Sequence, residues 1–316
     1  MSTVTHSEER RYGPNAFGDD LRRFVNLTVT LANTDFKLTY FGSALGYLWT
    51  LVRPLLFFGV LLVVFTKIFH LGAHIPHYSV TLLGAIIFWT FFVQVTTACV
   101  QCMLAREGLL RKMRFPRLVI PLAVALTAFY QFVLNMIPVF LFAIVSGVYP
   151  RLSWLELPVL MLLLTTLACG LGMVLSVLYV RMRDIQPIWD VTSQILFYAT
   201  PIIYPALAYG GAVPLPPAFP SLAGANPLER HDALFHPSAY GAIHTLGHIL
   251  MCSPLAAIMT QMRKALVGGS NLYEPSAAFA IGGAVRLLIP LGLILLAFGF
   301  GVLLFTREAP RIAENL

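Results

Sequence analysis

A series of long apolar runs, separated by short polar connections, constrains this chain more than any other feature. Each run is long enough to cross the hydrocarbon layer of a bilayer, which takes about 20 residues of α-helix. Backbone polar groups in lipid must be paired within their own segment, and long runs favour helices over the short alternating strands of a barrel. The sequence therefore predicts an all-α integral membrane protein.

Composition agrees with that fold class and argues against a water-soluble protein that binds nucleic acid. Of 316 residues, 58% are hydrophobic and 11% are charged, and the mean hydropathy is +0.79. One water-soluble core could not bury so much apolar surface. The net charge of +7 does not indicate a nucleic-acid partner, because the basic residues cluster at the ends of the apolar runs rather than on one soluble face.

The apolar runs and their flanks give a domain map. Residues 1–18 are polar, lack the apolar core of a signal peptide, and are expected to form a flexible cytoplasmic tail. From residue 19 onward, apolar side chains at helical spacing predict an amphipathic helix on the inner membrane face. A membrane domain is expected over residues 19–305, followed by a cytoplasmic tail over 306–316. The predicted transmembrane helices are six in number: 47–69, 79–103, 119–148, 154–180, 187–205 and 277–305.

Basic residues predict the orientation of these helices. Cytoplasmic connections of membrane proteins carry an excess of lysine and arginine. With six spans, the basic clusters all fall on one side, so both termini are expected in the cytoplasm. The clusters precede span one and follow spans two, four and six: Arg10, Arg11, Arg22, Arg23, Lys37, Arg106, Arg111, Lys112, Arg114, Arg117, Arg181, Arg183, Arg307 and Arg311.

The segment 238–267 allows two interpretations. It is apolar enough to be a seventh span, yet Ser253-Pro254 divides it and His244, His248 and Arg263 interrupt it. Serine can cap a helix and proline is favoured at its first position, so a new short helix is expected to begin at Pro254. We favour an external re-entrant helical hairpin between spans five and six over a seventh span.

The connection 104–118 after span two holds the densest charge in the chain. Its basic residues could simply fix orientation, in keeping with the positive-inside rule. Alternatively, a short amphipathic segment here could lie in the groove of a soluble partner and transmit that partner's motion. The residues proposed for this coupling role are Arg106, Glu107, Arg111, Lys112 and Arg114.

Patterns typical of enzymes and metal sites are weak in this sequence. No Gly-x-x-x-x-Gly-Lys-Ser/Thr motif occurs, so a nucleotide is not expected to bind by that device. His244 and His248 have the spacing of a zinc-protease helix, but Thr245 stands where the catalytic glutamate belongs. We therefore expect no catalytic residue, metal or cofactor. Several polar residues fall within the spans and could face neighbouring helices or a wet path: Gln94, Gln101, Gln131, Asn135, Asp190 and Gln194.

Five stretches recur in a characteristic order along the chain: 35–54, 108–117, 183–185, 200–205 and 253–256 with Arg263. Together they resemble the permease subunits of ABC-2-type polysaccharide exporters, which export O-antigen, teichoic acid, capsule or galactan. The resemblance covers nearly the whole chain from residue 20 to 305. Two features depart from the family pattern: Ser253 replaces the usual asparagine, and the external segment between Pro205 and Ser253 is longer than the simplest members need.

This resemblance implies a homodimer of six-span subunits in the inner (plasma) membrane, driven by separate ATP-binding-cassette ATPase subunits and moving a lipid-linked glycan outward. It implies an external gating helix that involves Ser253, Pro254 and Arg263. It also places spans one and five around the pore, where aromatic rings would contact sugar faces weakly. The pore-lining candidates are Tyr47, Trp49, Phe57, Phe58, Phe197, Tyr198 and Tyr204.

Two other functions compete with polysaccharide export. A drug or lipid exporter would share the same architecture, because cargo specificity resides in the width and lining of the pore. A membrane-embedded enzyme would need an acidic or metal-binding constellation at the membrane surface. Only 14 acidic residues occur, and no pair of carboxylates is placed for acid–base work.

Overall fold

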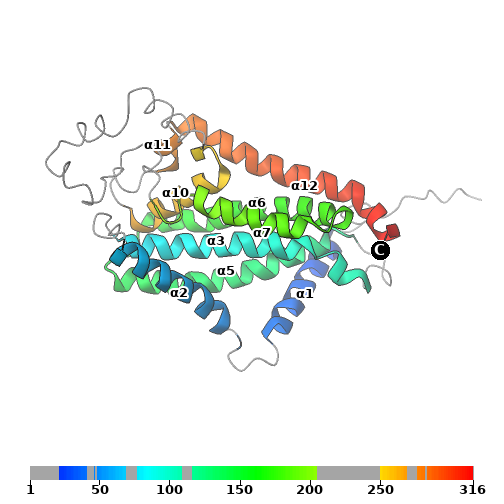
Figure 1. Ribbon diagram of the computed structural model, residues 1–316, viewed down its shortest axis with the longest axis horizontal. Helices are drawn as coiled ribbons and strands as arrows, with labels where there is room; N and C mark the ends of the chain where they lie inside the picture. Colours follow the sequence, from blue (N-terminus) through cyan, green and yellow to red (C-terminus); the bar gives the residue numbers. More distant parts are fainter. Residues whose placement is uncertain are drawn as a thin grey trace, which may run out of the picture.

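The computed structural model describes residues 21–40, 46, 48–68, 77–108, 116–204, 250–268, 276–281 and 283–315. Within these ranges every regular element is a helix (Figure 1). The main helices are α1 (Leu21–Tyr40), α2 (Leu48–Val63), α3 (Tyr78–Val100), α5 (Val119–Val145), α6 (Glu156–Arg181), α7 (Ile185–Ala199), α10 (Pro254–Val267), α11 (Ala277–Ile281) and α12 (Leu288–Asn315). Short turns of π-helix and 3-10 helix extend or precede them at Val64–Ile68, Leu104–Arg106, Leu152–Leu155 and Ala284–Leu287.

Five of these helical segments are long and apolar enough to cross a membrane. They match five of the six predicted spans within a few residues, except at the start of the last one. The segments are Leu48–Ile68, Tyr78–Val100, Val119–Val145, Leu152–Arg181 and Ala284–Glu308.

The remaining predicted span, span five at 187–205, contains α7, which has 15 residues and is shorter than the roughly 20 that cross a bilayer. The helix ends at Ala199 because Thr200 has extended backbone angles, φ −94° and ψ 143°. Thr200 precedes Pro201, and a residue before proline is forced away from helical angles. The prediction of a helix here is confirmed. The prediction that this helix is long enough to cross the membrane is not.

Helix α3 forms the centre of the bundle. It packs against α5, α6, α7 and α10, and most of its apolar surface is buried inside the chain. Aromatic rings fill the α3–α5 contact, where Phe91 stacks on Phe132 with 4.3 Å between ring centroids and Phe88 meets Phe132 edge-on at 4.9 Å. Such pairs add to the stabilisation from apolar burial alone. Figure 1 shows α12 lying along α6 on the opposite side of the bundle from α2.

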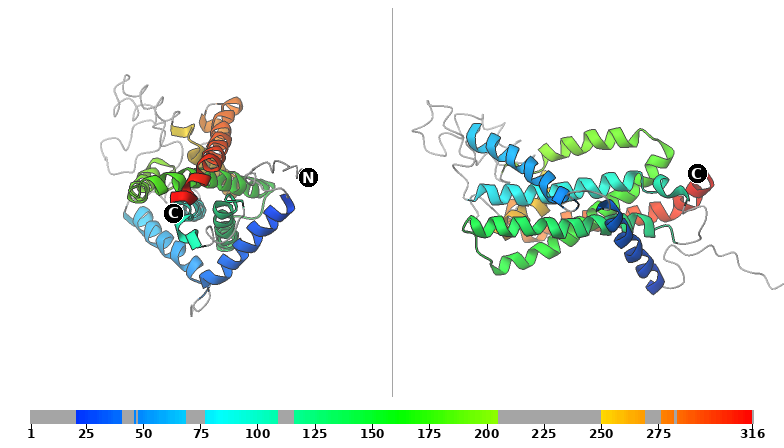
Figure 2. Two further views of the ribbon diagram at one scale, coloured as in Figure 1. Left: turned by 90° about the vertical axis from the view of Figure 1, so that its right-hand side faces the viewer. Right: turned by 90° about the horizontal axis from the view of Figure 1, so that it is seen from below.

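Helices α1 and α2 form the two arms of a V beside this bundle (Figure 2). Helix α1 is one continuous helix through Tyr40. Its buried stripe of Phe24, Thr28 and Ala32 recurs every four residues and faces α5, where the Thr127 hydroxyl donates to the Ala32 carbonyl at 3.3 Å. The amphipathic pattern expected from residue 19 onward therefore has a packing partner within the chain.

The last predicted span, 277–305, was expected to be one helix and is not. The short helix α11 ends at Ile281, and Gly283 has φ 145°, a backbone angle that glycine adopts readily and other residues rarely do. The spanning helix starts after this break. At the other end it continues to Asn315, so the predicted tail 306–316 is helical to that point, and Glu308 pairs with Arg181 of α6 at 2.6 Å.

Candidate functional site

One end of the bundle holds Arg106 and Glu107, two of the residues predicted to couple to a soluble partner. Here α3, α6 and α12 end and α5 and α7 begin (Figure 1). Arg106, in the 3-10 turn after α3, donates to the carboxylate of Asp35 on α1, and the two side chains are 17% and 28% exposed. The ion pair therefore ties α1 to the start of the charged connection 104–118.

The coupling residues are only partly within the described chain. Arg106 and Glu107 are half-buried, whereas Arg111, Lys112 and Arg114 lie outside the described residues. Two further cross-links tie helices at this end: Gln101 donates to Gln186 at the start of α7, and Arg181 of α6 pairs with Glu308 of α12. Four helices are thus joined by polar contacts around the charged connection.

The opposite end of the bundle holds α10, the helix predicted to begin at Pro254. Its first turn begins there, with Ser253 in extended conformation before it, although the Ser253 hydroxyl makes no capping hydrogen bond. The last carbonyls of a helix lack partners within the helix. In α10 they are satisfied by the segment before α6: Ser153 donates to Ala265 at 2.8 Å, Trp154 to Leu266 at 3.0 Å, and Arg151 to Val267 at 3.2 Å and Gly268 at 3.3 Å.

Arg263 lies in the interior of this end and is fully buried. Its guanidinium donates to the Ile202 carbonyl at 2.5 Å, and the Tyr78 hydroxyl at the start of α3 donates to the Ile203 carbonyl at 2.9 Å. Both contacts hold the non-helical segment that follows α7. A buried arginine is costly unless its donors are paired, so this arrangement fixes α10, α3 and the end of α7 relative to one another.

The seven aromatic candidates for pore lining fall into separate environments. Trp49, Phe57 and Tyr198 are exposed by 53%, 43% and 68% on the surface of the single chain. Phe58 and Phe197 are instead packed in the interior.

Phe58 meets Phe142 at 5.7 Å, and Phe197 meets Trp89 at 5.5 Å between ring centroids. Phe57 reaches Phe197 at 6.0 Å, which brings α2 and α7 together at this point. Tyr204 is half-buried and donates its hydroxyl to the Tyr198 carbonyl at 2.7 Å, while Tyr47 lies outside the described residues.

The polar residues of the spans divide between the two interpretations left open by the sequence. Gln94 of α3 donates to Gln131 of α5, so these two face neighbouring helices, as does Gln101. Asp190 and Gln194 are exposed on α7. They share the outward face of that helix with four apolar side chains, Ile188, Val191, Ile195 and Tyr198. This face is too polar for lipid contact alone.

Sequence reasoning missed the partners of the site residues. Asp35 is the only acidic residue of α1, and that isolation was the one available signal that it serves a specific contact. Its partner Arg106 is 71 positions away, and Trp154 is 112 positions from Leu266. No local spacing in the sequence encodes contacts across such distances.

Comparison with known proteins places this architecture in a family. A family model described as ABC-2 type transporter matches residues 26–212, which include α1 from its first turns through to α7. The chain is 30% identical over 186 residues to an O-antigen export system permease protein RfbA of Klebsiella pneumoniae, covering 58% of this chain and 71% of that protein. A protein with the same name from Myxococcus xanthus is 29% identical over 186 residues, covering 59% and 71%. The chain belongs to the ABC-2 type transporter family.

Proposed function

We propose that the chain is the membrane-spanning permease subunit of an ATP-driven exporter that moves lipid-linked polysaccharide across the plasma membrane. The observation that carries this proposal is the similarity to relatives named as O-antigen export permeases over more than half of the chain. The matched region 26–212 includes both the charged connection 104–118 and the exposed face of α7. These are the parts that an exporter needs for coupling and for its path.

The energy for export comes, in this proposal, from a separate ATP-binding-cassette ATPase subunit that docks on the connection 104–118. The sequence lacks the phosphate-binding motif that would let the permease hydrolyse ATP by that device. Arg106 supports the docking role because its ion pair with Asp35 would pass a push on the connection directly to α1. A segment tied in this way moves as a rigid body, as coupling requires.

The topology we propose has six spans and both termini in the cytoplasm, with the short helix α7 and the segment after it as span five. Helix α10 would then be the returning arm of an external re-entrant hairpin. Its 14 residues are too few to cross a bilayer, and its end is held by Arg151, Ser153 and Trp154 from the connection between α5 and α6. The contact of Arg263 with the segment after α7 would hold the outer end of the path closed. This contact would break when the path opens.

A homodimer would enclose the path between two copies of the chain. The outward face of α7 carries Asp190 and Gln194, and a face with these groups is better suited to a wet path than to lipid. Trp49, Phe57 and Tyr198 expose ring surface that could contact sugar rings weakly at several points. Phe58 and Phe197 would support these rings from within the bundle.

The test is deletion of the gene in its native host, followed by complementation with the full chain. The proposal predicts that surface polysaccharide disappears, that lipid-linked polymer accumulates inside the cell, and that the wild-type chain restores export. Normal surface polysaccharide in the deletion strain, together with loss of drug resistance or of an exported lipid, would contradict the proposal that polysaccharide is the cargo. Polymer that is absent from both compartments would indicate an enzyme of synthesis and contradict the transport role.

A further inference from the structure

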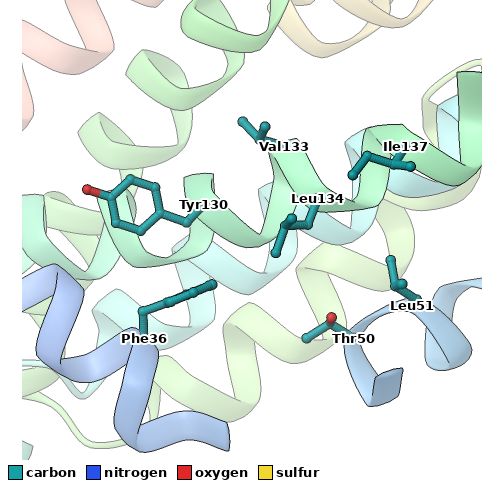
Figure 3. Close-up of a pocket in the computed structure, with 7 residues that line it drawn as sticks. All are labelled: Phe36, Thr50, Leu51, Tyr130, Val133, Leu134 and Ile137. Carbon is teal, nitrogen blue, oxygen red and sulfur yellow. The ribbon is translucent and has the colours of Figure 1, made fainter. Parts of the chain in front are cut away.

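A cavity of about 530 Å³ lies between α1, α2 and α5 (Figure 3). Its volume is within the range of roughly 300–1,000 Å³ that is usual for ligand pockets. Phe36, Leu134 and Thr50 point into a common space from three different helices in that view. The lining residues are Phe36, Thr50, Leu51, Tyr130, Val133, Leu134 and Ile137.

The lining indicates a hydrocarbon occupant. Apart from the hydroxyls of Thr50 and Tyr130, the side chains that line the cavity are entirely apolar. Val133 and Ile137 are 45% and 60% exposed, so the cavity opens sideways from α5 instead of into the bundle interior. A polar ligand would lose its hydrogen bonds to water here without replacement. In a membrane protein, a sideways opening of this kind faces lipid.

Two basic residues are close in sequence to residues that line the cavity, one on each arm of the V. Lys37 follows Phe36 on α1, and Arg53 lies about one turn after Thr50 on α2. Both are exposed, and neither forms an ion pair with a carboxylate among the described residues. A basic residue near a membrane surface attracts anionic lipid by about 1 kcal/mol, which corresponds to about a fivefold change in binding.

We propose that this cavity binds one acyl chain of an anionic membrane phospholipid, whose phosphate lies between Lys37 and Arg53. The apolar walls of the cavity accept the acyl chain, and the two basic groups select an anionic headgroup. Because Phe36 is on α1 and Leu51 is on α2, the bound lipid bridges the two arms of the V and sets the angle between them. The proposal does not depend on the identity of the exported cargo.

The test uses the full chain in nanodiscs of phosphatidylcholine containing 30% phosphatidylglycerol that carries a photoreactive group in its acyl chain. Mass spectrometry of the crosslinked peptides is expected to place the label on the segments around Phe36 and Val133–Ile137. The double variant Lys37→Gln/Arg53→Gln should reduce this labelling about 25-fold, as two contributions of about fivefold multiply. The matched control Lys67→Gln/Arg286→Gln removes two exposed basic residues away from the cavity and should leave the labelling unchanged.

A second set of variants tests the apolar walls that bind the acyl chain, without altering charge. Leu134→Trp fills the cavity and should abolish labelling at the two segments, including that from a photoreactive phosphatidylcholine. Leu162→Trp makes the same substitution at an exposed position of α6 and should leave the labelling at these two segments unchanged. The thermal unfolding temperature shows whether each variant is folded.

Two results would overturn the proposal. Labelling spread evenly over exposed apolar positions such as Leu162, unaffected by the charge variants, would mean that only ordinary boundary lipid is present. A crosslink between two copies of the chain through Val133 or Ile137, in place of the lipid label, would mean that this face is covered by protein.

Discussion

Two arginines each make a polar contact between separate helical segments, and they do so in different surroundings. Arg263 is fully buried and holds the carbonyl of Ile202, whereas Arg106 is mostly buried and pairs with Asp35. Burial makes each contact expensive to break, because the group left behind has no water to replace its partner. Each arginine therefore fixes one end of the bundle.

Asp35→Asn tests the contact at the end of the bundle where Arg106 lies. The substitution removes the charge opposite Arg106, and we expect it to lower the free energy of unfolding by about 1–3 kcal/mol, between the values for surface and buried ion pairs. Glu308→Gln is the matched control, because its partner Arg181 is 59% exposed and should lose less than about 1 kcal/mol. Thermal unfolding in detergent measures both, and equal losses would contradict a special role for the Asp35–Arg106 pair.

Tyr78→Phe tests the contact at the opposite end of the bundle, beside α10, with little change in volume. It removes the hydroxyl that donates to the Ile203 carbonyl and should cost about 0.5–1.5 kcal/mol. In reconstituted vesicles, the freed segment should also raise the leak of small ions through the resting protein. Arg263→Met removes the contact to the Ile202 carbonyl and is expected to raise that leak further, because a hydrogen bond from a charged donor contributes more than one from a neutral hydroxyl. If neither variant leaks ions, the segment after α7 is not part of the gate.

At the scale of elements, the close contact between α6 and α12 depends on small residues. A methyl group on Gly301 would lie 2.4 Å from the carbonyl oxygen of Gly170, and one on Gly170 would lie 2.6 Å from the backbone of Phe298. No side chain can fit at that distance, so the two helices meet backbone to backbone. This is the close approach that glycines permit between membrane helices.

Gly301→Ala should therefore destabilise the protein by at least the 1–3 kcal/mol that is typical of overpacking. Gly299→Ala in the same helix is the control, since a methyl group there meets nothing within 4 Å. The control should be neutral or slightly stabilising, because alanine favours helix over glycine by up to about 1 kcal/mol. Thermal unfolding of the two variants separates them, and equal stability would mean that α6 and α12 are not in tight contact.

Much of this fold could be predicted from the sequence because long apolar runs specify both helix and burial in lipid. The boundaries that failed have local physical causes. Thr200 before Pro201 ends α7 early, and Gly283 breaks the last predicted span at its start. The dipeptide Gly282-Gly283 was a visible signal for such a break. The predicted end at residue 305 followed hydropathy, whereas α12 continues through Arg307, Glu308 and Ala309, which favour helix, and past Pro310 to Asn315.

The site was less predictable because its residues act through distant partners. The basic character of 104–118 could be predicted, but the contact of Arg106 with Asp35 could not. Among the aromatic candidates, hydropathy could not distinguish exposed Trp49 from buried Phe58, since both lie in one apolar run. That distinction depends on which face of α2 meets α5, and only tertiary packing sets it.

At the scale of the whole molecule, the proposed orientation places the two ends of the bundle on opposite sides of the membrane. Cysteines introduced by Arg111→Cys and Ala212→Cys should react with an impermeant thiol reagent only from the inside and only from the outside, respectively. The background for this test lacks the four native cysteines, Cys99, Cys102, Cys169 and Cys252, of which the first three are buried. Reversed labelling would contradict the six-span topology.

The exposed rings are expected to matter for long cargo. Trp49→Ala or Tyr198→Ala should slow export of a long glycan severalfold, with unchanged insertion and dimer content, because each removes one weak contact for sugar rings. Leu162→Ala, at an exposed apolar position of α6, is the control and should have no effect. Normal export by both aromatic variants would mean that these rings are lipid anchors.

The central claim is that ATP hydrolysis in a partner subunit drives export through the connection 104–118. The most direct measurement compares ATP hydrolysis and glycan transfer in vesicles that contain the permease with its ATPase subunits. The double charge reversal Glu107→Lys/Arg111→Glu should leave the complex inserted and hydrolysing ATP while transfer falls at least tenfold. Transfer at the wild-type rate, in step with hydrolysis, would contradict the claim and reduce the charged connection to a signal for orientation.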